Sequence, residues 1–163
     1  LFFLPYPTGE RCPHAAPTAT AAFTGLTPRH SRAHLIRSVL EGITFAMREQ
    51  IAIFRTLNIP IQQVRATGGG ARSPFWRQLQ ADMYNAPVVT INVSEGAALG
   101  AGILAAVGTG HYASVPQATQ AIIRLHEKSK PNKKMVALYD RQYTKYASLY
   151  PALKDIFISL HKS

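Results

Sequence analysis

Apolar residues recur at three- and four-residue spacing through residues 31–57, a period that predicts one long amphipathic helix. Its apolar face would carry Leu35, Val39, Ile43, Met47, Ile51 and Phe54, with Leu40 beside it. Ser31 fits the N-cap position, and Asn58 followed by Pro60 predicts the end of the helix. Glycine is unfavourable inside a helix, so Gly42 predicts close packing against another element.

Shorter elements are predicted on both sides of this helix. Residues 1–27, which are rich in proline, threonine and alanine, indicate a strand, a long loop and a second strand. The later pattern predicts a strand over 64–67, a helix over 74–84, a strand over 88–93, a helix capped by Ser94, a helix near 115–128 and a helical region from about 134. This alternation predicts an α/β fold with a sheet covered by helices.

Composition indicates a folded, soluble chain. Its 163 residues fit one domain, and 47% hydrophobic with 16% charged residues argue against disorder. The small apolar residues over 97–107 form too short a run to span a bilayer, so no membrane partner is expected. Cys12 is the single cysteine, which excludes an internal disulfide and suits the reducing cytoplasm. Because residues 1–4 resemble the middle of a strand, we expect the sequence to be a fragment.

The formal net charge of +10 raises the question of a nucleic-acid partner. The basic residues near the C-terminus are scattered among apolar positions: Lys128, Lys130, Lys133, Lys134, Arg141, Lys145, Lys154 and Lys162. Four tyrosines recur there at helical spacing, namely Tyr139, Tyr143, Tyr146 and Tyr150. Such a stripe predicts rings packed on a core rather than rings stacked on bases, so we expect no nucleic-acid partner.

Three glycines follow the predicted strand at 64–67 and lead into the next helix. Ser73 fits the N-cap of that helix, and Pro74 fits its first position, where the missing N–H costs nothing. Glycines let backbone approach a ligand, and free N–H groups at a helix start favour anions, so residues 67–76 predict a nucleotide site. The spacing fits neither the P-loop nor the dinucleotide fingerprint. A tight turn that merely joins a strand to a helix explains it equally well.

Two residue pairs are candidates for reactive or metal sites. His30 and His34 share a helical face, but no carboxylate or cysteine completes a ligand set, which favours a surface pair at the helix start. Cys12 and His14 lie close in a loop without a third partner, which favours a buried small residue beside a loop histidine over a nucleophile pair. We therefore expect no metal site from these residues.

Charged residues in two other places have ordinary explanations as well as functional ones. Glu10 and Arg11 lie in a proline-bounded loop, where they line a cleft or staple the loop, and the sequence does not decide between the two. Glu95 opens a predicted helix, where a negative charge is favourable by the helix dipole alone.

Several segments resemble signatures of the FGGY carbohydrate kinases. Residues 21–26, followed after a short gap by 34–41, are similar to the second signature of this family. Residues 68–78 resemble its adenosine motif, which continues into Ala81 and Asp82 as it commonly does in the family. The matches fall in the expected order along nearly the whole chain.

Further segments resemble one branch of the family. Residues 4–6, 9–14, 95–100 and 146–154 look most like the xylulokinase branch, while gluconokinase-like members share much of the pattern. The branch would imply D-xylulose as the sugar, with gluconate as the alternative.

The resemblance implies a ribonuclease H-like C-terminal domain of the actin-like ATPase superfamily. Such kinases bind Mg-ATP and a sugar between two domains, and an aspartate takes the proton from the attacking hydroxyl. In the family the sugar-binding domain, the phosphate-binding turns and the catalytic aspartate lie upstream of the position of Leu1. We therefore expect no catalytic residue and no metal ligand in this chain, and most Mg²⁺ ligands outside it. The nucleotide contacts that carry over are Gly69 and Gly70, against adenosine and its α-phosphate, and Ser73, beside adenosine.

The sequence leaves three hypotheses. The first is the ATP-binding part of a sugar kinase, which meets its sugar through the N-terminal domain and is inactive alone. The second is a non-catalytic nucleotide-binding or regulatory module that acts through a partner chain. The third is a basic nucleic-acid-binding protein. The resemblance favours the first, in the cytoplasm and with a homodimer as one arrangement.

Overall fold

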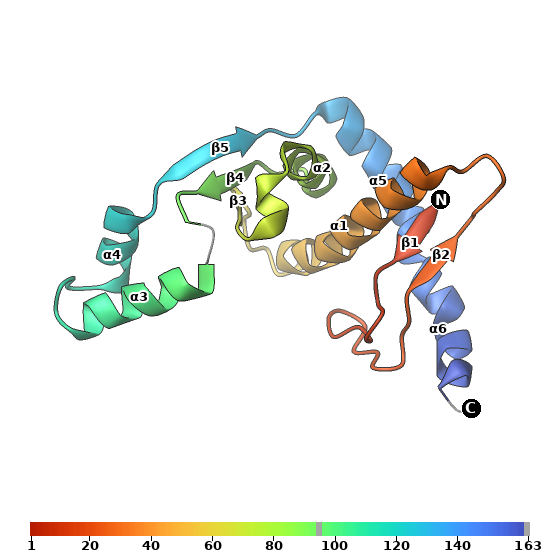
Figure 1. Cartoon of the computed structure of the whole chain (residues 1–163), viewed down its shortest axis with the longest axis horizontal. Coiled ribbons are helices and arrows are strands. Elements are labelled where there is room, and N and C mark those ends of the chain that lie inside the picture. The colour runs from red at the N-terminus through yellow and green to blue at the C-terminus, as the bar shows by residue number, and fades with distance from the viewer. Residues whose placement is uncertain (94–95, 162–163) are drawn as a thin grey trace. The chain divides into compact units, whose positions relative to one another are not determined.

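The computed structural model describes residues 1–93 and 96–161, and the chain divides into two compact units (Figure 1). Their bounds are Leu1–Ile61, Asp82–Asn85 and Asn132–Ser163 for unit 1, and Gln62–Ala81 and Ala86–Pro131 for unit 2. Unit 1 therefore takes both ends of the chain, and unit 2 takes most of its middle.

Unit 1 combines a pair of short strands with three helices. Its elements are β1 (Phe2–Leu4), β2 (Ala22–Thr24), α1 (Arg32–Thr56), α5 (Lys133–Ala147) and α6 (Leu149–Leu160). The two strands pair antiparallel, with Phe2 opposite Thr24. The predicted strand, loop and strand of the first 27 residues are confirmed.

Helix α1 follows its sequence signals closely. Ser31 is the N-cap, and its backbone N–H donates to Nδ1 of His34 at 3.1 Å, which completes a capping box. A Cβ atom at Gly42 would collide with the carbonyl oxygen of Phe3 in β1. The predicted close packing at this glycine is confirmed, because only a residue without a side chain lets β1 approach the helix there.

Aromatic side chains form the core of unit 1. Phe45 of α1 is 2% exposed and stacks on Tyr146 of α5, with ring centroids 4.9 Å apart. Tyr139 and Tyr150 are buried as well. The predicted tyrosine stripe is therefore confirmed as part of a core.

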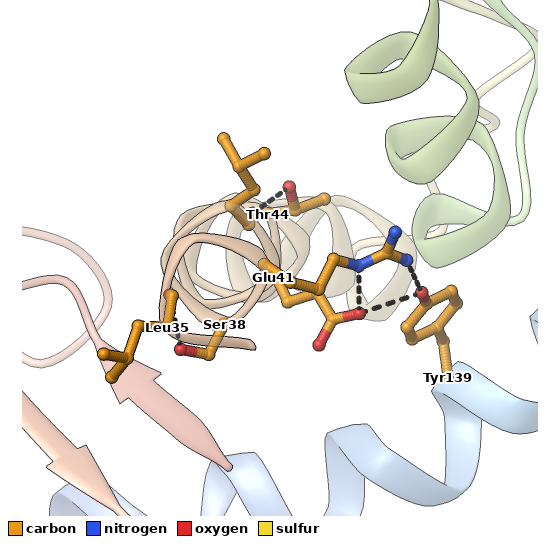
Figure 2. A network of polar contacts seen from close by, with 7 residues as sticks. Leu35, Ser38, Glu41, Thr44 and Tyr139 are labelled. Atoms are coloured by element: carbon orange, nitrogen blue, oxygen red, sulfur yellow. Dashed lines mark hydrogen bonds and ion pairs between the residues drawn. The ribbon is translucent and has the colours of Figure 1, made fainter. Parts of the chain in front are cut away.

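A polar network joins α1 to α5, and Figure 2 shows its members. Nε of Arg37 donates to Oε1 of Glu41 at 2.6 Å, and Nη2 donates to the Tyr139 hydroxyl at 2.5 Å. That hydroxyl donates to the same carboxylate oxygen at 3.1 Å. Ser38 and Thr44 turn their hydroxyls back to carbonyls of their own helix, at 2.8 and 2.7 Å. The buried side of α1 thus carries polar groups that neighbouring groups satisfy.

Unit 2 is built on a three-stranded sheet. Its elements are β3 (Val64–Ala66), the 3-10 turn η1 (Gly69–Arg72), α2 (Pro74–Tyr84, whose last residues count with unit 1), β4 (Val88–Ile91), α3 (Gly96–Gly108), α4 (Val115–Ile122) and β5 (Leu125–Ser129). The strand order is β3-β4-β5, with β3 parallel and β5 antiparallel to β4. The predicted strands near 64 and 88 and the helix over 74–84 are confirmed.

The region after residue 115 differs from its prediction. The helix expected near 115–128 ends at Ile122, and the chain then forms β5. Pairing with β4 outweighs the weak local preference of this polar segment, as tertiary context often does. The helical region expected from about 134 is confirmed, but Ser148 divides it into α5 and α6. The predicted cap Ser94 and its neighbour Glu95 lie outside the described residues.

Candidate functional site

A pocket of about 590 Å³ lies in unit 2 where β3 and β4 end. It is lined by Ala66, Thr67, Gly68, Ala71, Arg72, Arg77, Thr90, Ile91, Asn92, Val93, His126 and Glu127. Parallel strands joined by a helix bring their carboxyl ends to one sheet edge, where open α/β sheets bind ligands. The volume falls within the range of about 300–1,000 Å³ that is typical of small-molecule sites.

The glycine turn forms one edge of this pocket. Gly68 lines it with a φ of +78°, a left-handed conformation that glycine adopts freely. A Cβ atom at Gly69 would meet nothing within 4 Å, so its backbone is open to close approach. A Cβ atom at Gly70 would lie 2.7 Å from the indole ring of Trp76, so packing against that ring is enough to explain this glycine.

The three residues predicted to contact a nucleotide lie on this turn and at its end. The Ser73 hydroxyl accepts a hydrogen bond from the backbone N–H of Trp76 at 3.3 Å, so its predicted role as a helix cap is confirmed. Neither Ser73 nor the glycines at 69 and 70 line the pocket. Their neighbours Gly68, Ala71 and Arg72 do.

Charged side chains reach the pocket from three elements. Arg77 of α2 is 4% exposed, forms an ion pair with Glu127 of β5 and donates to the carbonyl oxygen of Ala71. Arg72 and His126 line the same pocket. Two guanidinium groups against one carboxylate leave an excess of positive charge, which favours an anionic ligand.

Asn92 joins the end of β4 to the start of β5. Its side-chain amide donates to the carbonyl of Ile122 at 3.0 Å, and its Oδ1 accepts from the backbone N–H of Arg124 at 2.8 Å. The backbone N–H of Asn92 donates to the carbonyl of Arg124 at 3.0 Å. These three bonds fix the part of the pocket wall that β5 supplies.

Sequence reasoning missed most of this wall. Thr90 and Asn92 follow no recognisable motif, and the only available signal was that the strand predicted over 88–93 ends at the same sheet edge as the glycine turn. His126 and Glu127 are not predicted to line the pocket, because the sequence pattern predicts a helix where the structure has β5.

Unit 1 holds a separate buried cluster around Glu49. The Tyr6 hydroxyl donates to its Oε2 at 3.3 Å and lies 3.4 Å from the Tyr146 hydroxyl, and Nε2 of His14 lies 3.5 Å from its Oε1. Burial raises the pKa of Glu49 to about 7, and burial lowers the pKa of His14 from 6.5. The His14 ring stacks on Tyr150 with centroids 4.0 Å apart. The cluster favours neutral forms of both ionisable groups and anchors the loop that follows β1.

The same loop also carries Glu10, Arg11 and Cys12. Glu10 and Arg11 line a pocket of about 480 Å³, and Oε1 of Glu10 accepts the backbone N–H of Cys12 at 2.8 Å. Both charged residues thus line a hollow, and Glu10 also staples the loop. The expected burial of Cys12 is wrong, because its loop holds it exposed.

The paired histidines serve the turn before α1. Nδ1 of His30 lies 3.0 Å from the Thr27 hydroxyl, and Nδ1 of His34 lies 2.9 Å from the Ser31 hydroxyl. In the part of the chain that the structure describes, no group of three or more His, Cys, Asp or Glu side chains could hold a metal ion. No helix within residues 1–93 and 96–161 is long and apolar enough to cross a membrane.

Comparison with known proteins decides the family. Residues 1–109 match the C-terminal domain of the FGGY family of carbohydrate kinases. The chain belongs to this family. The xylulose kinase of Staphylococcus epidermidis is 36% identical to it, over 98% of this chain and 32% of that protein. The gluconokinase of Bacillus licheniformis is 33% identical, over 95% of this chain and 33% of that protein.

Solved structures of FGGY kinases share the fold. The ligand-bound xylulose kinase from Lactobacillus acidophilus superposes with a TM-score of 0.86 at 31% identity, over 98% of this chain and 32% of that one. The gluconate kinase from the same organism gives 0.82 at 33% identity, over 94% and 31%. The predicted α/β fold of the actin-like ATPase superfamily, with helices over a sheet, is confirmed. This FGGY chain spans about a third of the length of the relatives it matches.

Proposed function

We propose that this FGGY chain is the ATP-binding part of a sugar kinase that transfers the γ-phosphate of ATP to a sugar hydroxyl. The observation that carries the proposal is the unit 2 pocket, which combines a glycine turn, a cationic wall and the volume of a small-molecule site. Gly69, Gly70 and Ser73 lie beside the pocket lining, next to Gly68, Ala71 and Arg72, and we propose that the backbone of both glycines faces adenosine and its α-phosphate, with Ser73 beside adenosine. The open space at Gly69 supports this placement.

Phosphoryl transfer is proposed to need a further part of the enzyme. The reaction requires the attacking hydroxyl, a base, the γ-phosphate and Mg²⁺ held together. The unit 2 pocket is proposed to hold the nucleotide, and this chain spans about a third of its relatives, so we place the metal ligands, the base and the sugar site mostly outside it. The chain alone would then bind ATP without transferring its phosphate.

The sugar is proposed to be D-xylulose, because the relatives named as xylulose kinases include proteins 34–37% identical over nearly the whole chain. Gluconate is the second candidate, since gluconokinases are among the relatives too. A coupled ADP-release assay with each sugar tests both, using the chain alone and then with an added N-terminal lobe of a xylulose kinase. Turnover that needs the lobe and D-xylulose supports the proposal. Turnover by the chain alone, or with gluconate only, contradicts the corresponding part.

ATP binding is tested at Gly69. A branched side chain there meets no protein atom, so Gly69→Val leaves the fold intact but blocks a ligand that approaches the backbone. We expect the affinity for ATP to drop tenfold or more, roughly 1.4 kcal/mol. Gly100→Val is the control, since position 100 is equally open but lies in α3 and not in the glycine turn. Unchanged ATP binding in folded Gly69→Val protein would refute the assignment.

A further inference from the structure

Arg77 is a charged side chain held inside unit 2. It is 4% exposed, and its Nε is buried with no hydrogen-bond partner among the described residues. The rest of its guanidinium reaches two elements besides its own helix: the carbonyl of Ala71 in η1 and the carboxylate of Glu127 in β5. All three residues line the pocket.

Stability alone is a poor explanation for this arrangement. Removing a guanidinium from water is costly, and a buried ion pair often contributes no more than a well-packed apolar residue would. Here the partner carboxylate is 66% exposed, so solvent screens the attraction that would offset the cost. The contacts do connect separate elements. One side chain from α2 binds both the glycine turn and the strand that carries His126 and Glu127.

We propose that Arg77 is a positioning residue of the nucleotide pocket, which holds η1 against β5 so that the glycine backbone faces the ligand. This inference rests on the proposed ATP site. Arg77 acts through the carbonyl of Ala71 and through Glu127, not by touching phosphate. Its influence is therefore the same for ATP and for adenosine, which has no phosphate.

If Arg77 instead contacted phosphate directly, its variants would change the affinities for ATP and adenosine differently. If Arg77 bound phosphate, Arg77→Met would weaken ATP and leave adenosine unchanged. In that case Glu127→Gln would strengthen ATP binding, because it removes a competing negative charge. If Arg77 positions the turn, Glu127→Gln weakens both ligands, because the guanidinium loses its ionic anchor on β5.

The experiment measures the dissociation constants of ATP and adenosine by titration of the whole chain. Trp76 is the single tryptophan and lies against Gly70, so its fluorescence reports on the glycine turn. We expect Arg77→Met to weaken both ligands by a similar factor of tenfold or more, Arg77→Lys to restore part of the loss, and Glu127→Gln to weaken both several-fold. The emission of Trp76 should shift in Arg77→Met even without ligand.

Controls separate the possible failures. Thr109→Ala removes hydrogen bonds to the carbonyls of Ala105 and Ala106 in the same unit, outside the pocket, and should leave both affinities unchanged. If the unaltered chain binds neither ligand, the proposed ATP site itself is wrong. If it binds both and the Arg77 variants match it, or lose ATP alone, the positioning role is overturned. Should Arg77→Met fail to fold, Glu127→Gln still decides, because its side chain is mostly exposed.

Discussion

The two units place buried polar groups in different surroundings. In unit 1, Glu49, Tyr6 and Tyr146 bond to one another inside an aromatic core. In unit 2, Arg77 is buried just as deeply but lines a pocket, beside Arg72. Polar groups that satisfy each other fix one packing of a core, whereas groups along a pocket wall remain close to an incoming ligand. On the function proposed above, unit 1 is the structural framework and unit 2 is the binding part.

The helices of the two units differ in how many of their side chains are buried. Helix α1 of unit 1 buries Phe45 among tyrosine rings. In α3 of unit 2, Ile103 is buried while most of the other side chains are at least partly exposed. Since apolar burial is the main stabilising contribution, substitutions in unit 1 should change stability most, and substitutions in unit 2 should change ligand affinity.

The largest expected effect is the loss of the aromatic core of unit 1. Phe45→Ala deletes a ring that is 2% exposed and contacts Tyr139, Tyr143 and Tyr146, so the free energy of unfolding should fall by about 3–5 kcal/mol. Urea unfolding followed by circular dichroism measures it. Phe54→Ala on the same helix is the control, because that ring is 48% exposed and should cost well under half as much. Equal losses would mean that unit 1 has no special core.

The second effect is a pH dependence confined to unit 1. Burial raises the pKa of Glu49 from 4.5 to about 7, so the folded state holds this proton more tightly than the unfolded chain. The contribution of Glu49 to the free energy of unfolding therefore falls as the pH rises from 4.5 to about 7, and it is level above that. His14 contributes the opposite slope below pH 6.5, because burial lowers its pKa.

Glu49→Gln removes the titrating carboxyl, and making the same change in a His14→Gln background removes the contribution of the imidazole 3.5 Å away. Relative to the unaltered chain, the variant should gain on the order of 2 kcal/mol in the free energy of unfolding between pH 5 and about 8. Unfolding titrations at several pH values measure the gain. Asp155→Asn controls for the change in net charge at an exposed site. A difference that stays constant across this range would show that Glu49 is ionised in the folded protein throughout.

The contrast between the units also explains what the sequence could reveal. Unit 1 follows local rules: Ser31 caps α1, Gly42 marks a close contact, and the tyrosine stripe is spaced for one face. These signals depend on residues near in sequence, so they could be read directly. The cluster of Tyr6, Glu49 and His14 could not, because its members come from separate elements.

The pocket of unit 2 was only partly predictable for the same reason. The glycine turn has a local signal, and Ser73 caps its helix as expected. Asn92 and His126 reach the pocket only through the pairing of β4 with β5, and the polar sequence of β5 gives little hint of a strand. The local sequence pattern does not indicate which distant strands pair with each other.

The third prediction tests whether the unit 2 turn serves stability as well as binding. Ser73→Ala removes the cap of α2 and should destabilise the chain by about 1 kcal/mol, less than any core change in unit 1. Ser73→Asp preserves a capping oxygen but adds a negative charge beside the proposed adenosine site. Thermal unfolding and ATP titration of both variants measure the two roles. If the aspartate variant binds ATP as tightly as the unaltered chain, Ser73 has a structural role only.

The smallest effect is expected at an ion pair of unit 1 whose carboxylate is exposed to solvent. Arg48 donates to Oδ1 of Asp140 at 2.7 Å, but the carboxylate is 54% exposed, and the guanidinium also lies 4.2 Å from the centre of the Tyr143 ring. Water and salt screen such a pair, and the ring contact persists without it, so Asp140→Asn should cost only about 0.5 kcal/mol. That cost should shrink further in 0.5 M salt, as chemical unfolding at two ionic strengths would reveal. A loss of several kcal/mol that does not depend on salt would mean that Asp140 belongs to the framework of unit 1. Exposed ion pairs of this unit would then stabilise it as strongly as its buried groups do.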